Sequence, residues 1–366
     1  MLLKQAVVLL LISVISTNTQ LYRSVDPLLN DELKSQNYRD HDGLSYRLPN
    51  NTMPLHYNIE LTTNVHKPNF AFNGKVTISV KVLTTTNSIT LQSRLLVIEN
   101  IQLLTVNSIV ITTNAIYRID EDVEFLIITL PIELKVNEIV MIVITYNGIL
   151  RDDNMGFYHS SYLNTDKKPV YLATTQFEST DARHGFPCYD EPGIRATFDL
   201  QIKHDKSYTA ISNTRSSGRT AITGTDYVVT KFETTPLMQT YLLAFIVSDF
   251  TYVQNSDKVL RQRIFAKKQS IAAGEGDVAL VMSERVIRQF EEHLGVKYSL
   301  SKMDQVAVPD FDAGAMENWG LVTYRENCLL FNTKSTSIDR ENILKIIAHE
   351  FAVSLKVSRY KNKTRI

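Results

Sequence analysis

Cysteine is scarce in this sequence, where only Cys188 and Cys328 occur among 366 residues. Two cysteines over this length exclude a small disulfide-framed scaffold. Both lie among apolar neighbours, and free cysteine is one of the most buried residue types. We therefore predict two buried thiols, with a single disulfide between them as the alternative.

An excess of one charge sign is also absent, because 39 Lys and Arg balance 39 Asp and Glu. Nucleic-acid-binding domains usually carry a basic stripe and a high pI, so no nucleic-acid partner is expected. Internal repeats and low-complexity tracts are absent too. The hydrophobic share of 44% and the charged share of 21% are ordinary for a globular protein. The length leaves room for two or three domains of roughly 150 residues each.

Long hydrophobic runs are missing. The most apolar one, residues 6–15, falls short of the roughly 20 residues that span a bilayer. Lys4 precedes this run and small or polar residues follow it, which predicts a secretory signal peptide over residues 1–19. An uncleaved membrane anchor is the alternative. The expected location is the secretory pathway and then the cell surface or exterior, where Asn50 in Asn50-Asn51-Thr52 is a candidate glycan acceptor.

Strand patterning dominates the first two thirds of the chain. At residues 75–82, Val76, Ile78, Val80 and Val82 alternate with polar residues, as in a half-buried strand. Similar or more continuous apolar runs follow at 88–98, 123–130, 138–146, 196–204 and 227–232. Many short strands with turn residues between them predict an antiparallel β-sandwich domain over residues 46–250.

Helical patterning appears only after residue 250. Apolar residues recur at helical spacing over 278–294 and again near the end, at Ile343, Leu344, Ile346, Ile347 and Phe351. Ser337 and Asp339 precede the second helix as N-cap candidates. The fold class is therefore predicted as mainly β with an α+β C-terminal part.

The second helix carries His349-Glu350. Taken alone, this pair is more often a hydrogen-bonded surface feature than a metal site. On zinc peptidase helices, however, His-Glu-x-x-His places two histidines one turn apart, and the Glu serves as general base. Such a zinc ion activates water and polarises the scissile carbonyl.

A second motif lies upstream, Gly314-Ala315-Met316-Glu317-Asn318. It resembles the exopeptidase motif of the gluzincin zinc aminopeptidases of the aminopeptidase N type, and His349 follows it at the usual distance of that family. An aminopeptidase must hold a free α-ammonium group, which converging carboxylates do through charge-assisted hydrogen bonds. The alternative is a plain Gly-Ala turn ahead of a strand.

Other segments resemble the same family in order. Residues 46–57 resemble the opening strand of its N-terminal domain, 175–192 the loop that reaches into the active site, and 241–245 the strand that closes the domain. Ser179 and His184 are small departures from the pattern. The resemblance covers 46–352 and implies a saddle-like β-sandwich followed by the beginning of a thermolysin-like catalytic domain over 251–352.

The resemblance also implies roles for individual residues. Gln176, Glu178 and Glu317 would line the pocket for the substrate's N-terminus. Gly314 and Ala315 would contact the peptide backbone, and Met316 and Asn318 belong to the same substrate-binding motif. His349 would be the first ligand of Zn²⁺, and Glu350 the general base. The implied substrates are peptides with a free N-terminus, and full-length relatives are often membrane-tethered.

One position breaks the zinc motif, because Val353 stands where the family has its second histidine. The family's third ligand, a Glu, and its oxyanion-stabilising Tyr are not found either. Since a catalytic zinc normally has three protein ligands, we expect zinc binding to be lost and this chain to be inactive. The remaining histidines lie outside the motif and are not expected to replace it: His41, His56, His66, His159, His184, His204 and His293.

The resemblance ends where a basic tail begins, at residues 353–366, which hold five basic residues and no acid. Val353-Ser354 can be encoded by GTAAGT, the common intron start. We interpret the tail as a retained intron or gene-model error, with an electrostatic arm for anionic surfaces as the alternative. We also expect residues 343–347 to expose an apolar stripe, which would leave the chain after residue 250 marginally stable.

Two functions of different classes follow. The first is a zinc aminopeptidase of which this chain is an incomplete record. The second is a secreted, non-catalytic binding module or decoy that uses the β domain and half a peptide pocket.

Overall fold

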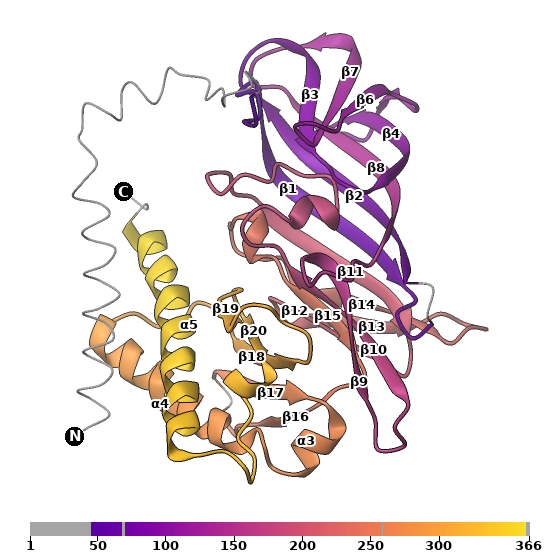
Figure 1. The fold of residues 1–366 in the computed structure, drawn as a ribbon. Coiled ribbons are helices and arrows are strands. Elements are labelled where there is room, and N and C mark those ends of the chain that lie inside the picture. Colours follow the sequence, from indigo (N-terminus) through magenta and orange to yellow (C-terminus); the bar gives the residue numbers. More distant parts are fainter. Residues whose placement is uncertain (1–44, 68–69, 258, 364–366) are drawn as a thin grey trace.

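The computed structural model describes residues 45–67, 70–257 and 259–363, with side chains described as far as residue 355. The predicted signal peptide therefore lies outside the described residues. Strands dominate the N-terminal part, and the α-helices of the described residues lie in the C-terminal part (Figure 1). The predicted fold class, mainly β with an α+β C-terminal part, is confirmed.

The N-terminal part is built on an eight-stranded sheet (Figure 1). In spatial order its strands are β13 (Ser216–Ala221), β14 (Tyr227–Phe232), β11 (Thr197–Asp205), β1 (Thr52–Thr63), β2 (Ala71–Val82), β8 (Ile139–Ile149), β4 (Val97–Thr105) and β5 (Val110–Thr112). Neighbours are antiparallel except β1 and β11, which run parallel. The four alternating apolar residues of β2 are fully buried, as their period of two predicts.

Two smaller sheets complete this part. One contains β12 (Thr209–Ser212), β15 (Phe245–Ser248), β10 (Pro169–Gln176) and β9 (Gly156–Leu163), and the other β3 (Thr86–Gln92), β7 (Phe125–Leu134) and β6 (Ile116–Asp120). Phe157 of β9 joins two sheets through edge-to-face contacts with Phe72 at 4.9 Å and Phe245 at 5.0 Å between ring centres. Burial of aromatic rings between sheets is what fixes a sandwich.

The C-terminal part is a mixed five-stranded sheet with helices. Its strands are β16 (Thr251–Gln254), β17 (Arg261–Ala266), β18 (Lys302–Val308), β20 (Leu321–Arg325) and β19 (Ala315–Met316). Its helices are α3 (Lys268–Ala272), α4 (Asp277–Leu294) and α5 (Ser337–Lys363), of which α4 and α5 pack side by side (Figure 1). Three 3₁₀ turns are η1 (Ala182–His184), η2 (Thr240–Leu242) and η3 (Glu326–Cys328).

Three details of the sequence interpretation are corrected. Ile343 and Ile347 are fully buried in the core of the C-terminal part, so the expected exposed stripe is wrong for them. The capping interactions of α5 centre on Thr336, not Ser337: its hydroxyl accepts from Asp339 N at 3.3 Å, and Asp339 accepts from Thr336 N at 2.7 Å. Cys328 is only half-buried.

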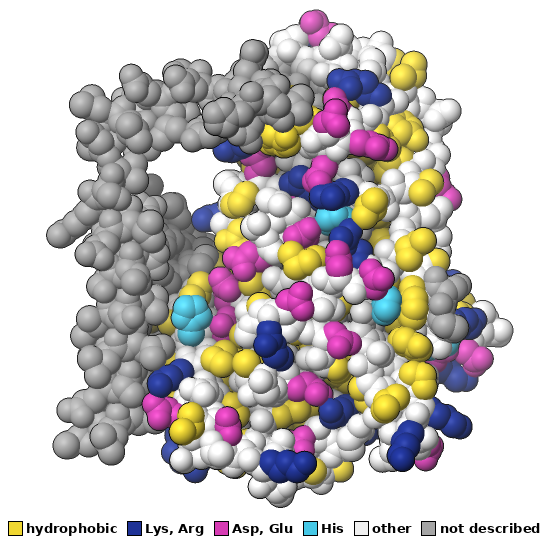
Figure 2. All heavy atoms as spheres, viewed as in Figure 1, with side chains coloured by type: hydrophobic (Ala, Val, Ile, Leu, Met, Phe, Trp, Pro, Cys, Tyr) yellow, Lys and Arg dark blue, Asp and Glu magenta, His cyan; other side chains and the backbone are white. Residues whose placement is uncertain are grey.

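Both cysteines are free, and Cys188 is buried as predicted. Charged side chains of both signs are interspersed on the face shown in Figure 2, in keeping with the net charge of zero. Among the described residues, every helix is too short or too polar to cross a bilayer.

Candidate functional site

The segment that carries Gly314 to Asn318 is fastened at its beginning to the N-terminal part. Asp310 accepts hydrogen bonds from Tyr158, through its main-chain oxygen, and from Ser160, through its carboxylate, both at 2.9 Å. Arg325 donates from Nε to Phe311 O at 2.9 Å and from its main-chain N to Gly314 O at 3.1 Å. Strand β9 of the N-terminal part and strand β20 of the C-terminal part therefore both hold the beginning of this loop.

The end of the same segment is fastened as tightly. Asn213 donates to Trp319 O at 2.8 Å and to Leu242 O at 2.7 Å, and accepts from Ala244 N at 2.9 Å. All donor and acceptor capacity of this buried amide except one lone pair is thus used. Lys302 Nζ donates to Gly320 O at 2.7 Å. Glu317 lies between these anchors, on a loop with little freedom to move.

Gly320 permits the close approach of this loop to the backbone of Asn213. Its φ is +74°, and a Cβ placed there would lie 2.1 Å from Asn213 O. Left-handed backbone favours glycine, and a backbone oxygen cannot give way as the end of a flexible side chain can. Only glycine fits between the loop and Asn213.

We expect Gly320→Ala to lower the free energy of unfolding by about 2–3 kcal/mol, because it combines backbone strain with a clash. Gly193→Ala is the matched control: nothing lies within 4 Å of its added Cβ, so its effect should stay within about 0.5 kcal/mol. Urea denaturation of both variants measures the difference. Equal midpoints would show that the loop can retreat from Asn213.

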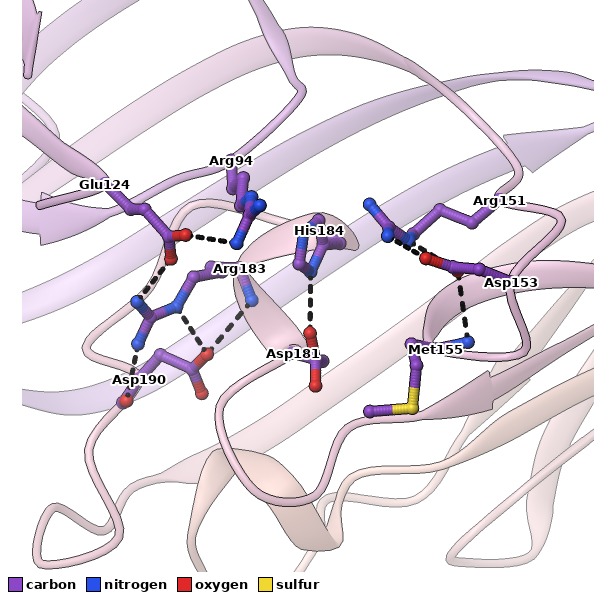
Figure 3. Close-up of polar contacts among 9 residues, drawn as sticks. All are labelled: Arg94, Glu124, Arg151, Asp153, Met155, Asp181, Arg183, His184 and Asp190. Carbon is purple, nitrogen blue, oxygen red and sulfur yellow. Dashed lines mark hydrogen bonds and ion pairs between the residues drawn. The ribbon is translucent and has the colours of Figure 1, made fainter. Parts of the chain in front are cut away.

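The loop that carries Glu178 follows β10 and is held by Arg183 (Figure 3). Arg183 donates to Asp190 Oδ2 at 3.0 Å and to Glu124 Oε2 at 2.7 Å. Thr240 donates to the other oxygen of Asp190 at 2.8 Å. Burial raises the pKa of Asp190, and Arg183 opposes that rise. His184, one of the departures from the family pattern, is buried and lies 3.1 Å from Asp181.

Glu350 sits on α5, which packs against β19 and η3. Its side chain is buried, and its Oε2 has no hydrogen-bond partner among the described residues. Burial, followed by the charges of Glu317 and Glu178, raises the pKa of Glu350 to about 8. The carboxyl group is therefore mostly protonated at pH 7 while nothing cationic is bound beside it.

Three carboxylates from distant segments thus converge. Burial raises the pKa of Glu178, and Glu317 raises it further. Burial and then the same two glutamates raise the pKa of Tyr241, in η2. Like charges gathered in this way disfavour ionisation of one another and favour a bound cation. Within the described residues, none of the three glutamates forms an ion pair.

The other predicted residues fall around this cluster. Gln176 ends β10, with its buried Oε1 unpartnered among the described residues. Gly314 is exposed, and Ala315 and Met316 form β19 beside β20. Buried Asn318 donates to Thr323 at 3.4 Å. His349 is exposed, on the same helix as Glu350. The roles assigned to these residues stay predictions.

Two tyrosines were not predicted as site residues. Tyr241 was assigned to a closing strand, but η2 covers Thr240–Leu242 and β15 begins only at Phe245. Tyr324 is fully buried, and burial together with Glu350 raises its pKa well above the usual value. No motif marks either residue, and only the folded chain brings them to the glutamates.

The residues present do not fit a catalytic zinc ion. Such an ion needs three protein ligands and one open position. His349 is followed one turn later by half-exposed Val353, which offers no ligand atom. No group of three or more His, Cys, Asp or Glu suited to a metal comes together in the described part of the chain.

The chain matches the Peptidase M1 N-terminal domain over residues 53–242 and the Peptidase family M1 domain over residues 278–354. The first match alone covers half of the sequence. The chain belongs to the peptidase M1 family. It is of the aminopeptidase N type, as its relatives show.

Three relatives illustrate the likeness. Aminopeptidase N of Canis lupus familiaris is 39% identical over 320 residues, covering 84% of this chain and 33% of the relative. Aminopeptidase N of Homo sapiens is 49% identical over 212 residues, covering 57% of this chain and 22% of the relative. Alanine/arginine aminopeptidase of Saccharomyces cerevisiae is 36% identical over 310 residues, covering 83% of this chain and 35% of the relative.

The chain thus spans about a third, or less, of the length of the M1 relatives it matches. M1 peptidases are in general zinc-dependent, but no metal site forms among the residues that this structure describes. The predicted domain limits, 46–250 and 251–352, stay predictions.

Proposed function

We propose that the described residues form the part of an M1 aminopeptidase site that captures the free α-ammonium group of a peptide. The observation that carries this proposal is the convergence of Glu178, Glu317 and Glu350. Glu178 is exposed, Glu317 is half-buried and Glu350 is buried, and carboxyl groups that gather in this way ionise more readily when a cation lies among them. A peptide's N-terminal ammonium group is such a cation, and carboxylates bind it through charge-assisted hydrogen bonds.

The surrounding residues suit the same ligand. Gln176 has a buried side-chain oxygen without a partner among the described residues, which would accept a hydrogen bond from the ammonium group. Gly314 is exposed on the edge of the loop and has no side chain there, so an extended peptide can approach it. The loop that carries Glu317 is anchored at both ends, so the Glu317 carboxylate is already in position before a peptide binds. Little conformational entropy is then lost on binding, which favours affinity.

In this proposal the 366-residue chain binds peptides without hydrolysing them, because Val353 replaces the second zinc histidine. An assay with an aminoacyl chromogenic substrate, with and without added zinc, tests the claim. We expect no turnover above the background of a Glu350→Ala control. Turnover that a chelator abolishes would overturn it.

The second candidate is a secreted binding module or decoy. The same convergence of carboxylates, present without a fitting metal site, favours it for this chain. It requires passage through the secretory pathway, which the predicted signal peptide would provide. Expression in animal cells, with the chain recovered from the medium, supports this location. Retention in the cytosol contradicts it.

Glu317→Gln is expected to weaken binding of a peptide with a free N-terminus by about tenfold, roughly the 1.4 kcal/mol of one charge-assisted hydrogen bond. An N-acetylated peptide should bind equally weakly to both proteins, because it lacks the ammonium group. Glu341→Gln, an exposed glutamate of α5, is the control and should bind as the unchanged chain does. Titration calorimetry gives the affinities. Equal loss for both peptides in Glu317→Gln would contradict the assigned role.

The pH dependence of this binding has a defined sign. Since the pKa of Glu178 is raised and that of Glu350 is raised to about 8, protons compete with the peptide below pH 8, and affinity should rise as pH increases from the usual carboxyl range toward pH 8. Affinity should fall again when the peptide's own α-ammonium group loses its proton, near pH 8. A pH-independent affinity would show that the ammonium group is not what is bound.

A further inference from the structure

A cavity of about 620 Å³ lies between the N-terminal part and the C-terminal sheet. Its walls come from β12, from the hairpin of β13 and β14, and from β17 and β18, which are far apart in sequence (Figure 1). We call it the seam pocket and define it by Arg215, Arg219, Arg261, Arg263 and Asp304. Its volume lies in the range of small-molecule sites.

The seam pocket holds more positive than negative charge. Four arginines line it but only two acids, Glu233 and Asp304. Asp304 is already saturated, since Arg263 binds both of its oxygens at 2.7 Å and Lys302 lies at 2.8 Å. Glu233 is exposed and lies 3.9 Å from Arg215, too far for a strong pair.

Two guanidinium groups of the seam pocket have no ion-pair partner among the described residues. Arg261 forms no ion pair with any described residue, and its Nε is buried without a hydrogen-bond partner there. Burial lowers the pKa of Arg261 and the charge of Arg263 lowers it further, while Asp304 opposes this decrease. Arg219 forms no ion pair in the described chain either, and donates only to Lys206 O at 2.9 Å. Arginines that line a cavity without an acidic partner favour an anionic, acceptor-rich ligand there.

We propose that the seam pocket binds a dianionic oxyanion of the phosphate type, held by Arg261 and Arg219. Two unpaired guanidinium groups balance the charge of −1.5 to −2 that a phosphate group carries at neutral pH. The planar fork of arginine matches phosphate oxygens. The ligand is either free phosphate or a phosphate monoester, for which the open, roomy cavity leaves space.

This site is separate from the peptide site, yet one residue connects them. Lys302 pairs with Asp304 on the floor of the seam pocket and donates to Gly320 O at the end of the Glu317 loop. Lys302 also donates to Ser212 O, on the wall of the pocket. Anion binding in the seam pocket is measured directly and does not depend on peptide capture.

The experiment titrates the 366-residue chain with inorganic phosphate and, separately, with phenyl phosphate, at constant ionic strength, by calorimetry and thermal shift. We expect saturable binding that Arg261→Gln weakens at least about tenfold, a loss of one charge-assisted contact. Arg219→Gln, on the exposed hairpin, should show the same loss of affinity. If Arg261→Gln does not fold, Arg219→Gln alone tests whether the anion binds in the seam pocket. Phosphate alone binding identifies the free ion, and tighter phenyl phosphate binding identifies an ester.

Arg118→Gln is the matched control, since Arg118 is an exposed arginine of β6 paired with Asp120, away from the pocket. It should bind both probes as the unchanged chain does. Absence of saturable binding to either probe overturns the proposal. Binding that both pocket variants retain unchanged does the same, because the anion would then lie elsewhere.

Discussion

Replacing Asp304 by Asn is expected to lower the free energy of unfolding by about 3–5 kcal/mol, the usual cost of removing one partner from a buried ion pair. Asp304 is fully buried in β18, where both oxygens bind Arg263 and one also lies 2.8 Å from Lys302. The neutral amide keeps the shape but leaves two cations without their anion. Lys302 would then also hold the Glu317 loop less firmly through Gly320.

Asp226→Asn provides the comparison for this variant. Asp226 pairs with Lys206 at 2.7 Å, but both side chains are largely exposed. An exposed pair contributes about 0–1 kcal/mol, so the two substitutions separate burial from pairing. Urea denaturation measures both. If Asp304→Asn costs no more than Asp226→Asn, the buried network is not what secures β18.

The pH dependence of the Asp304 effect follows from its pKa. Burial would raise that pKa, but Lys302 and Arg263 outweigh burial and hold it below 3.8, its ordinary value. A carboxylate with a lowered pKa stabilises the fold above its unfolded-state pKa, and the contribution disappears as pH falls through the folded-state pKa. The difference in unfolding free energy between the unchanged chain and Asp304→Asn should therefore be fully present at pH 5 to 7. It should decrease only below pH 3.8.

Strand β18 also shows where sequence patterning fails. Its residues Lys302, Asp304 and Gln305 are polar, yet every side chain of the strand is buried. A period of two identifies strands with one solvent-facing side, as in β2, where Val76 to Val82 alternate. A strand that is buried on both sides has no such period. The sequence also does not show that Lys302 and Asp304 neutralise each other in the core.

The candidate site shows a different limit. Glu178, Glu317 and Glu350 were assigned from resemblance to a family, because they lie far apart in the chain and no spacing connects them. What the fold adds is their mutual effect on pKa and the neighbouring Tyr241, in a turn without a motif. Position 353 could be judged from sequence, since residues one helical turn apart share a face.

Replacing Val353 by His is expected to increase zinc affinity by at least roughly a hundredfold. His349 and Val353 lie one turn apart on α5, the first exposed and the second half-exposed, so an imidazole fits without burial. Two histidines on one helix face chelate a zinc ion that one histidine alone holds weakly. Even changes in residues that only orient metal ligands alter affinity by about 10–100-fold, and an added ligand does more.

Zinc titration with a competing chelator dye measures this gain, with Val353→Asn as the control that is polar but lacks the imidazole. The added affinity should disappear at pH 5, because histidine binds metal only when neutral and its ordinary pKa is about 6.5. It should also disappear in a His349→Ala, Val353→His double variant, which restores a single histidine. Since three protein ligands are needed for a catalytic ion, binding should return without hydrolysis. Equal zinc affinity for the Asn and His variants would show that His349 does not face position 353, and the role assigned to His349 would then fail.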